Sequence, residues 1–524
     1  MSEPMLDILP SKKILKTTAF AQSLKFVACM RTTLSLLSVA PSLSLLVPLS
    51  LMLLTNSSNV YFTLSLLAFF FSLMSFNRNW SFVIGTLTSD MPLIIGLPHF
   101  TMMVLNGVYA ITQPDAFPTH AKHLHRAIET GVYGLPVAAF LLSTFSTFIA
   151  IYHLHTSIRA RTATRNALSA AGYDVSSFPP GLGLFPFALS PFATTRRTPA
   201  AVICKKDVEY TAIKNVGAVA PILERFKDED GTLHLSADIY YHPTCVGANP
   251  PVLLYVHGGA WFLGAKDLGV IMPLIDRAAK DGYVVMSVDY RLCPAAKFPD
   301  MVVDVKSAIK YIRTGDMAKS LGFDVDSATV VLAGDSAGGH INNLVALSQN
   351  DPFFQPGFED VDTSVQGFID MFGPSDGRFT HEDIFSEIVI QKRYKGNEEV
   401  ADIKEDMERV SPICYDLTKT FGAKKEDIRW LHFHGTKDGL VPIEENRRYY
   451  GKIFDALGET VTNWESMGAR KVVHVELQGS FHGFCGFLTM KTMAFCDAVT
   501  VVLEDIKMNR EGGRRVEDVN VHIN

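Results

Sequence analysis

Long runs of apolar residues dominate the first third of the chain. Residues 32–54 contain no charged side chain, and a helix rising about 1.5 Å per residue over this length crosses a hydrocarbon core of about 30 Å. Three further stretches also lack Asp, Glu, Lys and Arg: residues 60–76, 91–112 and 132–152. The pattern predicts an all-α transmembrane region of about four helices over residues 32–155.

The second stretch is short and is soon followed by Arg78, so a buried helix of a soluble bundle is an alternative for it. A cleavable signal peptide fits poorly, because the first stretch is long, begins late and is followed by others. Basic residues before the first stretch and after the fourth place both flanks in the cytosol. They are Lys12, Lys13, Lys16, Lys25, Arg31, Arg159, Arg161 and Arg165. We therefore predict an integral, multi-pass membrane protein with a cytosolic C-terminal domain, and the endoplasmic reticulum is a candidate compartment.

After residue 200 the pattern changes to short β-branched or aromatic runs separated by helical stretches. This alternation is typical of an α/β fold with a mostly parallel, twisted sheet and helices on both faces. The expected strands are residues 208–213, 234–242, 251–256, 283–289, 329–333, 366–371, 430–434 and 472–477, and the first two are expected to pair antiparallel. Helices are predicted at residues 300–313 and 443–457, where apolar positions recur at helical spacing.

These patterns divide the chain into five parts. They are a cytoplasmic segment (1–31), the membrane region (32–155), a linker (156–199), an α/β domain (200–510) and a C-terminal tail (511–524). The linker includes a Pro/Gly/Phe-rich stretch without a regular period, which we interpret as a packed connector. Residues 376–428 interrupt the α/β alternation with a charged, less regular segment, which we interpret as an inserted cap.

A Gly-Asp-Ser-Ala-Gly motif centred on Ser336 follows the strand at residues 329–333 and precedes a helical pattern. Small residues two positions before and after the serine allow a sharp strand-to-helix turn, which exposes Oγ and points the helix N-terminus at the reacting centre. The pentapeptide alone fits a glycine-rich turn without catalysis equally well. In its strand-to-helix context it predicts a serine nucleophile.

A His-Gly-Gly-Ala-Trp segment directly follows the strand at residues 251–256. Acyl transfer requires amide donors that stabilise the oxyanion of a tetrahedral intermediate. Gly258 and Gly259 are expected to present two such N–H groups, and Ala337, the residue after the serine, presents another. These three residues form the predicted oxyanion hole.

A serine nucleophile requires a general base, and the chain has 16 histidines from which to choose. His482 lies just beyond the last predicted strand, in a loop at the same end of the sheet as the serine. His432, His434 and His474 belong to strand patterns and suit positions in the core or at its edge. His482 is therefore the predicted base.

The acid that orients the base should lie between the serine and the histidine in the chain. Asp438 directly follows the strand at residues 430–434 and is preferred. Asp376, which follows the preceding strand and otherwise suits a turn, is the alternative. Asp289 and Arg291 end another strand, where we expect them to pair with each other and brace the oxyanion loop.

The segments HGGAW, DYRLCP, GDSAGG, HGTKDGLVP and GSFHGF occur in this order over residues 250–484. As a set they resemble the hormone-sensitive-lipase-like branch of the α/β-hydrolase fold, which includes arylacetamide-deacetylase-like carboxylesterases. The resemblance implies a triad of Ser336, Asp438 and His482 and hydrolysis through an acyl-enzyme ester. Ala260 departs from the family, which often has a further glycine there, and the resemblance does not extend to the apolar N-terminal region.

The sequence thus predicts a membrane-anchored serine esterase, lipase or deacetylase that cleaves a carboxylic ester of a lipophilic substrate. A prenylcysteine methylesterase-like enzyme and a non-catalytic binding protein of the same fold are the alternatives. A net charge of −6 without a basic, aromatic-rich block argues against nucleic acid as a partner. Seven scattered cysteines without metal-ligand spacing predict free thiols, no metal and no cofactor. The expected partners are the ester and membrane lipid, and no protein partner is indicated.

Overall fold

The computed structural model describes residues 134–176, 178, 201–267, 272–378, 389, 400–421, 428–486 and 489–520. The first three predicted membrane stretches lie outside these residues, as does most of the Pro/Gly/Phe-rich linker. The fourth stretch, residues 132–152, falls largely within helix α7 (Gly134–Ala170). Among the helices of the described residues, none combines the length and the apolar character that a membrane span requires.

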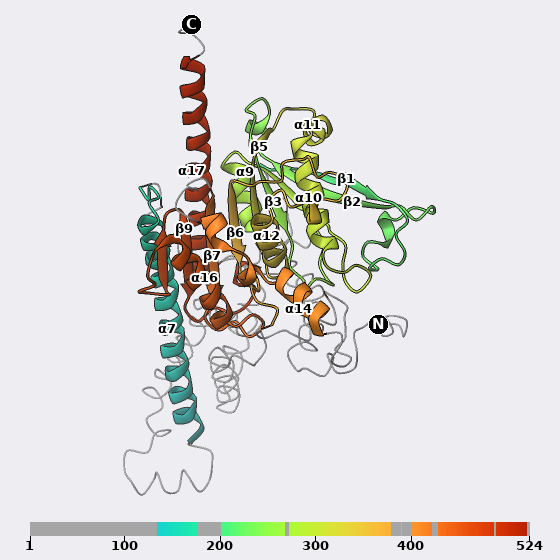
Figure 1. The fold of residues 1–524 in the computed structure, drawn as a ribbon. Coiled ribbons are helices and arrows are strands. Elements are labelled where there is room, and N and C mark those ends of the chain that lie inside the picture. Colours follow the sequence, from blue (N-terminus) through green and yellow to red (C-terminus); the bar gives the residue numbers. More distant parts are fainter. Residues whose placement is uncertain are drawn as a thin grey trace, which may run out of the picture.

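The described strands form one nine-stranded sheet in the order β1-β2-β4-β3-β5-β6-β7-β9-β8 (Figure 1). They are β1 (Ile203–Ile213), β2 (Leu233–Tyr241), β3 (Pro251–Val256), β4 (Val284–Val288), β5 (Asp326–Asp335), β6 (Gly367–Met371), β7 (Arg429–Gly435), β8 (Ser466–Ala469) and β9 (Val472–Leu477). The pairs β1/β2, β2/β4 and β8/β9 are antiparallel, and all other neighbours are parallel. The predicted α/β class, with its antiparallel start, is confirmed.

The strands β3 and β4 are buried along their whole length because both faces of the sheet are covered. In β3, Leu254 and Val256 point into one core, whereas Leu253 and Tyr255 point into the other. This alternation follows from the two-residue period of an extended chain. All six residues of β3 are buried.

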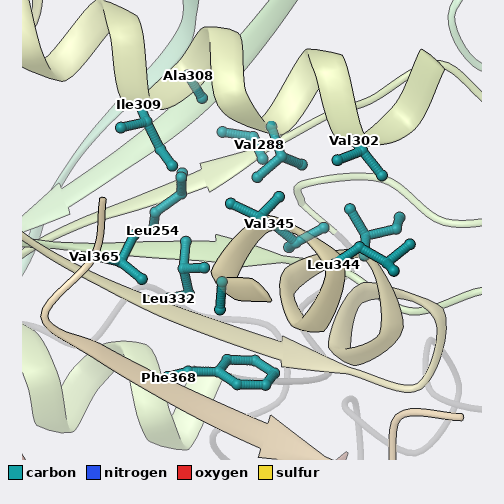
Figure 2. Close-up of a cluster of buried hydrophobic side chains, with 14 of the residues drawn as sticks. Leu254, Val288, Val302, Ala308, Ile309, Leu332, Leu344, Val345, Val365 and Phe368 are labelled. Carbon is teal, nitrogen blue, oxygen red and sulfur yellow. The ribbon is translucent and has the colours of Figure 1, made fainter. Parts of the chain in front are cut away.

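Helices cover both faces of the sheet. On one face lie α10 (Asp300–Arg313), α12 (Ala337–Leu347) and α16 (Ile443–Leu457), and on the other lie α7, α9 (Met272–Lys280) and α17 (Met490–Asn520). Figure 2 shows the core on the face covered by α10 and α12, where Ile309 of α10 and Val345 of α12 meet Leu254 and Leu332 of the central strands. Three further helices are α11 (Asp316–Leu321), α14 (Val400–Arg409) and α15 (Leu417–Phe421). The 3-10 turns are η4 (Glu224–Phe226), η5 (Pro243–Cys245), η6 (Pro352–Phe354), η8 (Pro412–Cys414) and η9 (Phe484–Gly486).

Two described helices cross predicted domain boundaries. α7 continues to Ala170, beyond the predicted start of the linker at residue 156, and packs its small residues against the edge of the sheet. A Cβ added to Gly468 of β8 would lie only 1.9 Å from the carbonyl oxygen of Ala167, which shows how closely the two elements approach. α17 extends through Asn520, beyond the predicted start of the tail at residue 511. The six described cysteines are free thiols, as expected.

Candidate active site

The predicted site residues follow the carboxyl ends of four different strands. The oxyanion segment follows β3, Ser336 follows β5, Asp438 follows β7 and His482 follows β9. These strands are mutually parallel, so their carboxyl ends meet along one edge of the sheet. This edge is where open α/β sheets form their sites.

Ser336 occupies a strained turn between β5 and α12, with φ of 52° and ψ of −120°. The turn is tied to the next strand, because the Ser336 amide donates to the Met371 carbonyl at 2.9 Å. A Cβ added to Gly338 would lie 2.0 Å from the carbonyl oxygen of Val256. One added to Gly334 would lie 2.6 Å from the carbonyl carbon of Gly338. The close approach of these backbones therefore explains the two glycines of the motif.

The structure brings Ser336, His482 and Asp438 together in one hydrogen-bonded chain. The Ser336 hydroxyl donates to His482 Nε2 with an O–N distance of 2.9 Å. His482 Nδ1 donates to Asp438 Oδ2 at 2.7 Å. The ring of Phe372 packs against the imidazole, with the ring centroids 4.5 Å apart. In this arrangement the proton of His482 lies on Nδ1, and Nε2 is free to accept a proton from the serine.

Asp438 is fully buried, and four donors surround it. Its Oδ1 accepts from the amides of Leu440 and Val441, both at 2.9 Å. Its Oδ2 accepts from His482 and lies 3.1 Å from Nε2 of His434. Burial raises the pKa of Asp438, but the charges and hydrogen bonds of the two histidines outweigh burial and hold that pKa below its ordinary value. The carboxylate is therefore ionised at neutral pH.

His434 is a member of the site that the sequence assigned to a core or edge position. It is buried, and its Nδ1 accepts from Asn446 Nδ2 at 2.9 Å, so its proton lies on Nε2. This Nε2 lies 2.9 Å from the Val441 carbonyl oxygen and 3.1 Å from Asp438 Oδ2, so the N–H group faces both. The signal in the sequence was its position four residues before Asp438. His432 and His474 do occupy the core, where their Nδ1 atoms lie 2.8 Å apart.

Asp376, the alternative acid, lies in a different set of contacts. Its carboxylate pairs with Arg378 at 3.0 Å and with Arg448 at 3.4 Å. It also accepts from the Arg378 amide two residues later, which is the geometry of a turn. The structure thus places Asp438, and not Asp376, against His482.

The predicted oxyanion hole needs one correction. The amide of Gly258 donates to Asp335 Oδ1 at 3.0 Å, an oxygen that also accepts from the Tyr255 hydroxyl, so Gly258 is already paired. Within the described residues, no protein acceptor pairs with the amides of Gly259 or Ala337. Ala337 is the first residue of α12, where the amides of a helix have no partner within the helix.

Asp335 was not among the predicted site residues, although it stands directly before the nucleophile in the motif. Burial raises the pKa of its carboxyl group, while the hydrogen bonds from Tyr255 and Gly258 oppose that rise. These two bonds join β3, the oxyanion loop and the nucleophile turn. Asp335 therefore fixes the position of the loop relative to Ser336.

The expected pair of Asp289 and Arg291 is wrong. Arg291 instead makes hydrogen bonds of 2.8–3.0 Å with Asp304 of α10. Asp289 accepts from the amide and the ammonium group of Lys266. The two side chains of one turn thus brace two different neighbours, because each finds a buried partner of opposite charge on another segment.

Part of the chain is similar to known proteins. Residues 237–453 match the family model described as BD-FAE. Esterase LipQ of Mycobacterium tuberculosis is 32% identical over 53% of this chain and 61% of its own length. The probable isoprenylcysteine alpha-carbonyl methylesterase ICMEL2 of Arabidopsis thaliana is 26% identical over 40% of this chain and 48% of its own. The solved structure titled Bacterial Heroin Esterase covers 59% of this chain and 85% of that one, at 18% identity and a TM-score of 0.41.

The chain spans between about half and three fifths of the length of these two curated relatives. The region that matches the family model includes the strands and loops that carry Ser336 and the oxyanion segment. Over that region the chain is similar to carboxylic ester hydrolases of the α/β-hydrolase fold.

Proposed function

We propose that this chain is a serine carboxylic-ester hydrolase with Ser336 as its nucleophile, His482 as its base and Asp438 as the orienting acid. One observation carries the proposal. Ser336 Oγ, His482 and Asp438 form a continuous hydrogen-bonded chain of 2.9 and 2.7 Å, and the serine stands on a strained turn at the sheet edge. A buried carboxylate, a neutral imidazole and a hydroxyl in this order are the groups that acyl transfer requires.

The reaction follows from this geometry. Ser336 Oγ attacks the ester carbonyl while His482 Nε2 takes its proton, and the ionised Asp438 stabilises the imidazolium that forms. The imidazolium then protonates the departing alcohol, which leaves an acyl ester on Ser336. Water, deprotonated by the same Nε2, attacks that ester, the carboxylic acid leaves, and the proton returns to Ser336 Oγ.

The negatively charged oxygen of each tetrahedral intermediate needs backbone N–H donors that do not already bond to another acceptor. We assign this role to the amides of Gly259 and Ala337, since Gly258 already donates to Asp335. The N-terminus of α12 adds its partial positive charge at the same place. Each amide of this kind contributes about 3 kcal/mol of transition-state stabilisation in acyl-transfer enzymes.

A fluorophosphonate probe tests the nucleophile. We expect labelling of the intact protein at Ser336, hydrolysis of a p-nitrophenyl ester, and loss of both in the Ser336→Ala variant. Ser307→Ala on α10 is the matched control, because the Ser307 hydroxyl only donates to the Val303 carbonyl of its own helix. If the intact protein neither reacts with the probe nor hydrolyses the ester, the proposal of a serine hydrolase is excluded. A non-catalytic binding protein of this fold would then be favoured.

We also propose that the chain is held at a lipid bilayer and acts on lipophilic esters. Large apolar side chains of α7 are exposed, namely Phe145, Phe148, Ile151, Tyr152 and Ile158. The helix has no charged residue before Arg159, and the apolar stretches at residues 32–54, 60–76 and 91–112 precede it. Exposed apolar side chains that follow long apolar stretches of sequence favour contact with lipid over contact with water.

The position of α7 connects this surface to the proposed active site. Ala171, just after the helix, accepts from the Lys471 amide before β9 begins, whereas His153 lies beside Gly479 after β9 ends. The helix therefore runs antiparallel to β9, and its residues before His153 extend past the edge of the sheet that carries Ser336 (Figure 1). A bilayer at α7 would therefore lie on the side of the sheet edge that carries Ser336.

Membrane fractionation tests the anchoring. We expect the full chain to stay in the membrane pellet after alkaline carbonate extraction, and to prefer esters with longer acyl chains when it is assayed there. Protease treatment of sealed vesicles should digest residues 200–524 from the cytosolic side. Recovery of the chain in the carbonate supernatant would contradict the anchor, and protection of residues 200–524 would contradict the orientation.

A methylesterase acting on prenylcysteine is the second candidate. It is favoured by the similarity to the probable isoprenylcysteine alpha-carbonyl methylesterase ICMEL2 of Arabidopsis thaliana. Hydrolysis of a prenylcysteine methyl ester, compared with acyl esters of short alcohols, separates the two. A higher kcat/KM for the methyl ester would favour the second candidate.

A further inference from the structure

The oxyanion loop has a conformation that side chains disfavour. Gly259, Ala260 and Trp261 have successive φ angles of 131°, 51° and 65°. Two of these residues carry a Cβ, so the loop is strained and keeps its shape only where other parts of the protein hold it. Because the Gly259 amide belongs to this loop, the contacts that hold the loop also place that donor.

The indole of Trp261 supplies one such contact. It is buried and donates from Nε1 to Nδ1 of His340 at 3.1 Å, with the two rings edge to face. Since an indole nitrogen can only donate, Nδ1 must accept and the imidazole proton must lie on Nε2. His340 Nε2 then donates to the carbonyl oxygen of Val410 at 2.7 Å. Burial lowers the pKa of His340 to about 4, so the ring is neutral at neutral pH.

The two ends of this bridge belong to different parts of the site. His340 lies in the first turn of α12, and its amide donates to the carbonyl of Ser336 at 3.0 Å. Val410 follows α14 within residues 376–428, the segment that the sequence predicts to be an insert. The next residue, Ser411, accepts from the Gly377 amide at 3.1 Å, which ties the segment after α14 to the start of the insert.

We propose that His340 is a positioning residue that holds the oxyanion loop in its reactive shape and couples the insert to that loop. The inference rests on the proposed function, because it assigns His340 a part in shaping the proposed oxyanion hole. The ring holds the loop through Trp261 and is itself held by Val410. A movement of the insert at Val410 therefore moves the ring, the indole and, with them, the Gly259 amide.

Trp261→Phe is the first test, because it removes the Nε1 donor and keeps an aromatic ring. Trp430→Phe is the matched control, since Trp430 of β7 is also buried and also donates from Nε1, but to the Tyr450 hydroxyl of α16 at 2.9 Å. The measurements are kcat and KM for a p-nitrophenyl ester and the affinity of a trifluoromethyl ketone, which forms an oxyanion when serine adds to it. We expect Trp261→Phe to lower kcat and ketone affinity about 10- to 100-fold with little change in KM, and Trp430→Phe to change neither.

Variants of His340 test the bridge itself. His340→Gln keeps an acceptor and a donor and should retain most of the activity, whereas His340→Phe should lose as much as Trp261→Phe. Combining His340→Phe with Trp261→Phe should add no further loss, because both remove one interaction. Ser411→Ala, which loosens the insert, should lower kcat when His340 is present and have no effect in the His340→Phe background.

A folded Trp261→Phe variant with kcat and ketone affinity within about twofold of wild type would overturn the proposal, even if His340→Phe fails to fold. Additive effects of Ser411→Ala and His340→Phe would overturn the coupling to the insert. Both results are distinct from failure of the proposed function. That failure would appear as absent turnover in the wild-type protein, or as turnover that survives Ser336→Ala.

Discussion

The Asp438→Asn substitution tests the hydrogen-bonded chain at its most buried member. Asp438 Oδ1 accepts from the Leu440 and Val441 amides at 2.9 Å, so in the variant the amide oxygen must take that place. The NH2 group then replaces Oδ2, which lies 2.7 Å from Nδ1 of His482. An amide NH2 group donates hydrogen bonds and cannot accept one from an N–H group at Nδ1. His482 must therefore present a bare Nδ1 and carry its proton on Nε2.

In that tautomer His482 cannot take a proton from Ser336. We expect kcat to fall about 10⁴-fold, the loss found when the acid of such a triad becomes an amide. This loss corresponds to about 5 kcal/mol of transition-state stabilisation. The volume of the side chain is unchanged, so the fold should persist.

Steady-state hydrolysis of a p-nitrophenyl ester measures the loss, and circular dichroism checks the fold. Asp376→Asn is the matched control, because its carboxylate pairs with Arg378 and Arg448 instead of the base. We expect this control to keep kcat near that of wild type. An Asp438→Asn variant with more than a tenth of the wild-type kcat, or an equal loss in Asp376→Asn, would refute the assignment.

Three further predictions follow from the same contacts. Gly338→Ala should abolish fluorophosphonate labelling, because the added Cβ would lie 2.0 Å from the Val256 carbonyl oxygen; a folded variant that labels normally would contradict this close approach. Arg291→Met should lower the free energy of unfolding in urea by about 3–5 kcal/mol, because it leaves the buried Asp304 carboxylate without its cation; a change below about 1 kcal/mol would contradict this role. Burial lowers the pKa of His340 from 6.5 to about 4, so the unfolded state binds its proton first and stability should fall as the pH drops from 6.5 to 4, by up to about 3 kcal/mol. His340→Gln should remove that part of the slope in urea titrations, and parallel wild-type and variant curves would disprove it.

Local sequence patterns predicted every described strand except β8, and they predicted two of the helices on one face of the sheet. The strand at residues 251–256 and the helices at residues 300–313 and 443–457 have the predicted bounds, because burial on two faces and helical periodicity are both visible along the chain. β8 was missed, since its short segment contains a glycine and has no apolar alternation. It is a strand because it pairs with β9 and accepts the close approach of α7, and neither contact is encoded locally.

Some features of the candidate site could likewise be predicted from the sequence, whereas others were decided only by the tertiary structure. The strand-to-helix turn at Ser336 and the loop positions of Asp438 and His482 could be predicted, because glycine spacing and strand ends are local properties and parallel strands end at one edge. The tertiary structure decided the partners, such as Gly258 with Asp335. Partner choice among buried polar groups depends on which donors and acceptors the folded sheet brings within about 3 Å, often from segments far apart in the chain. No local pattern records those distances.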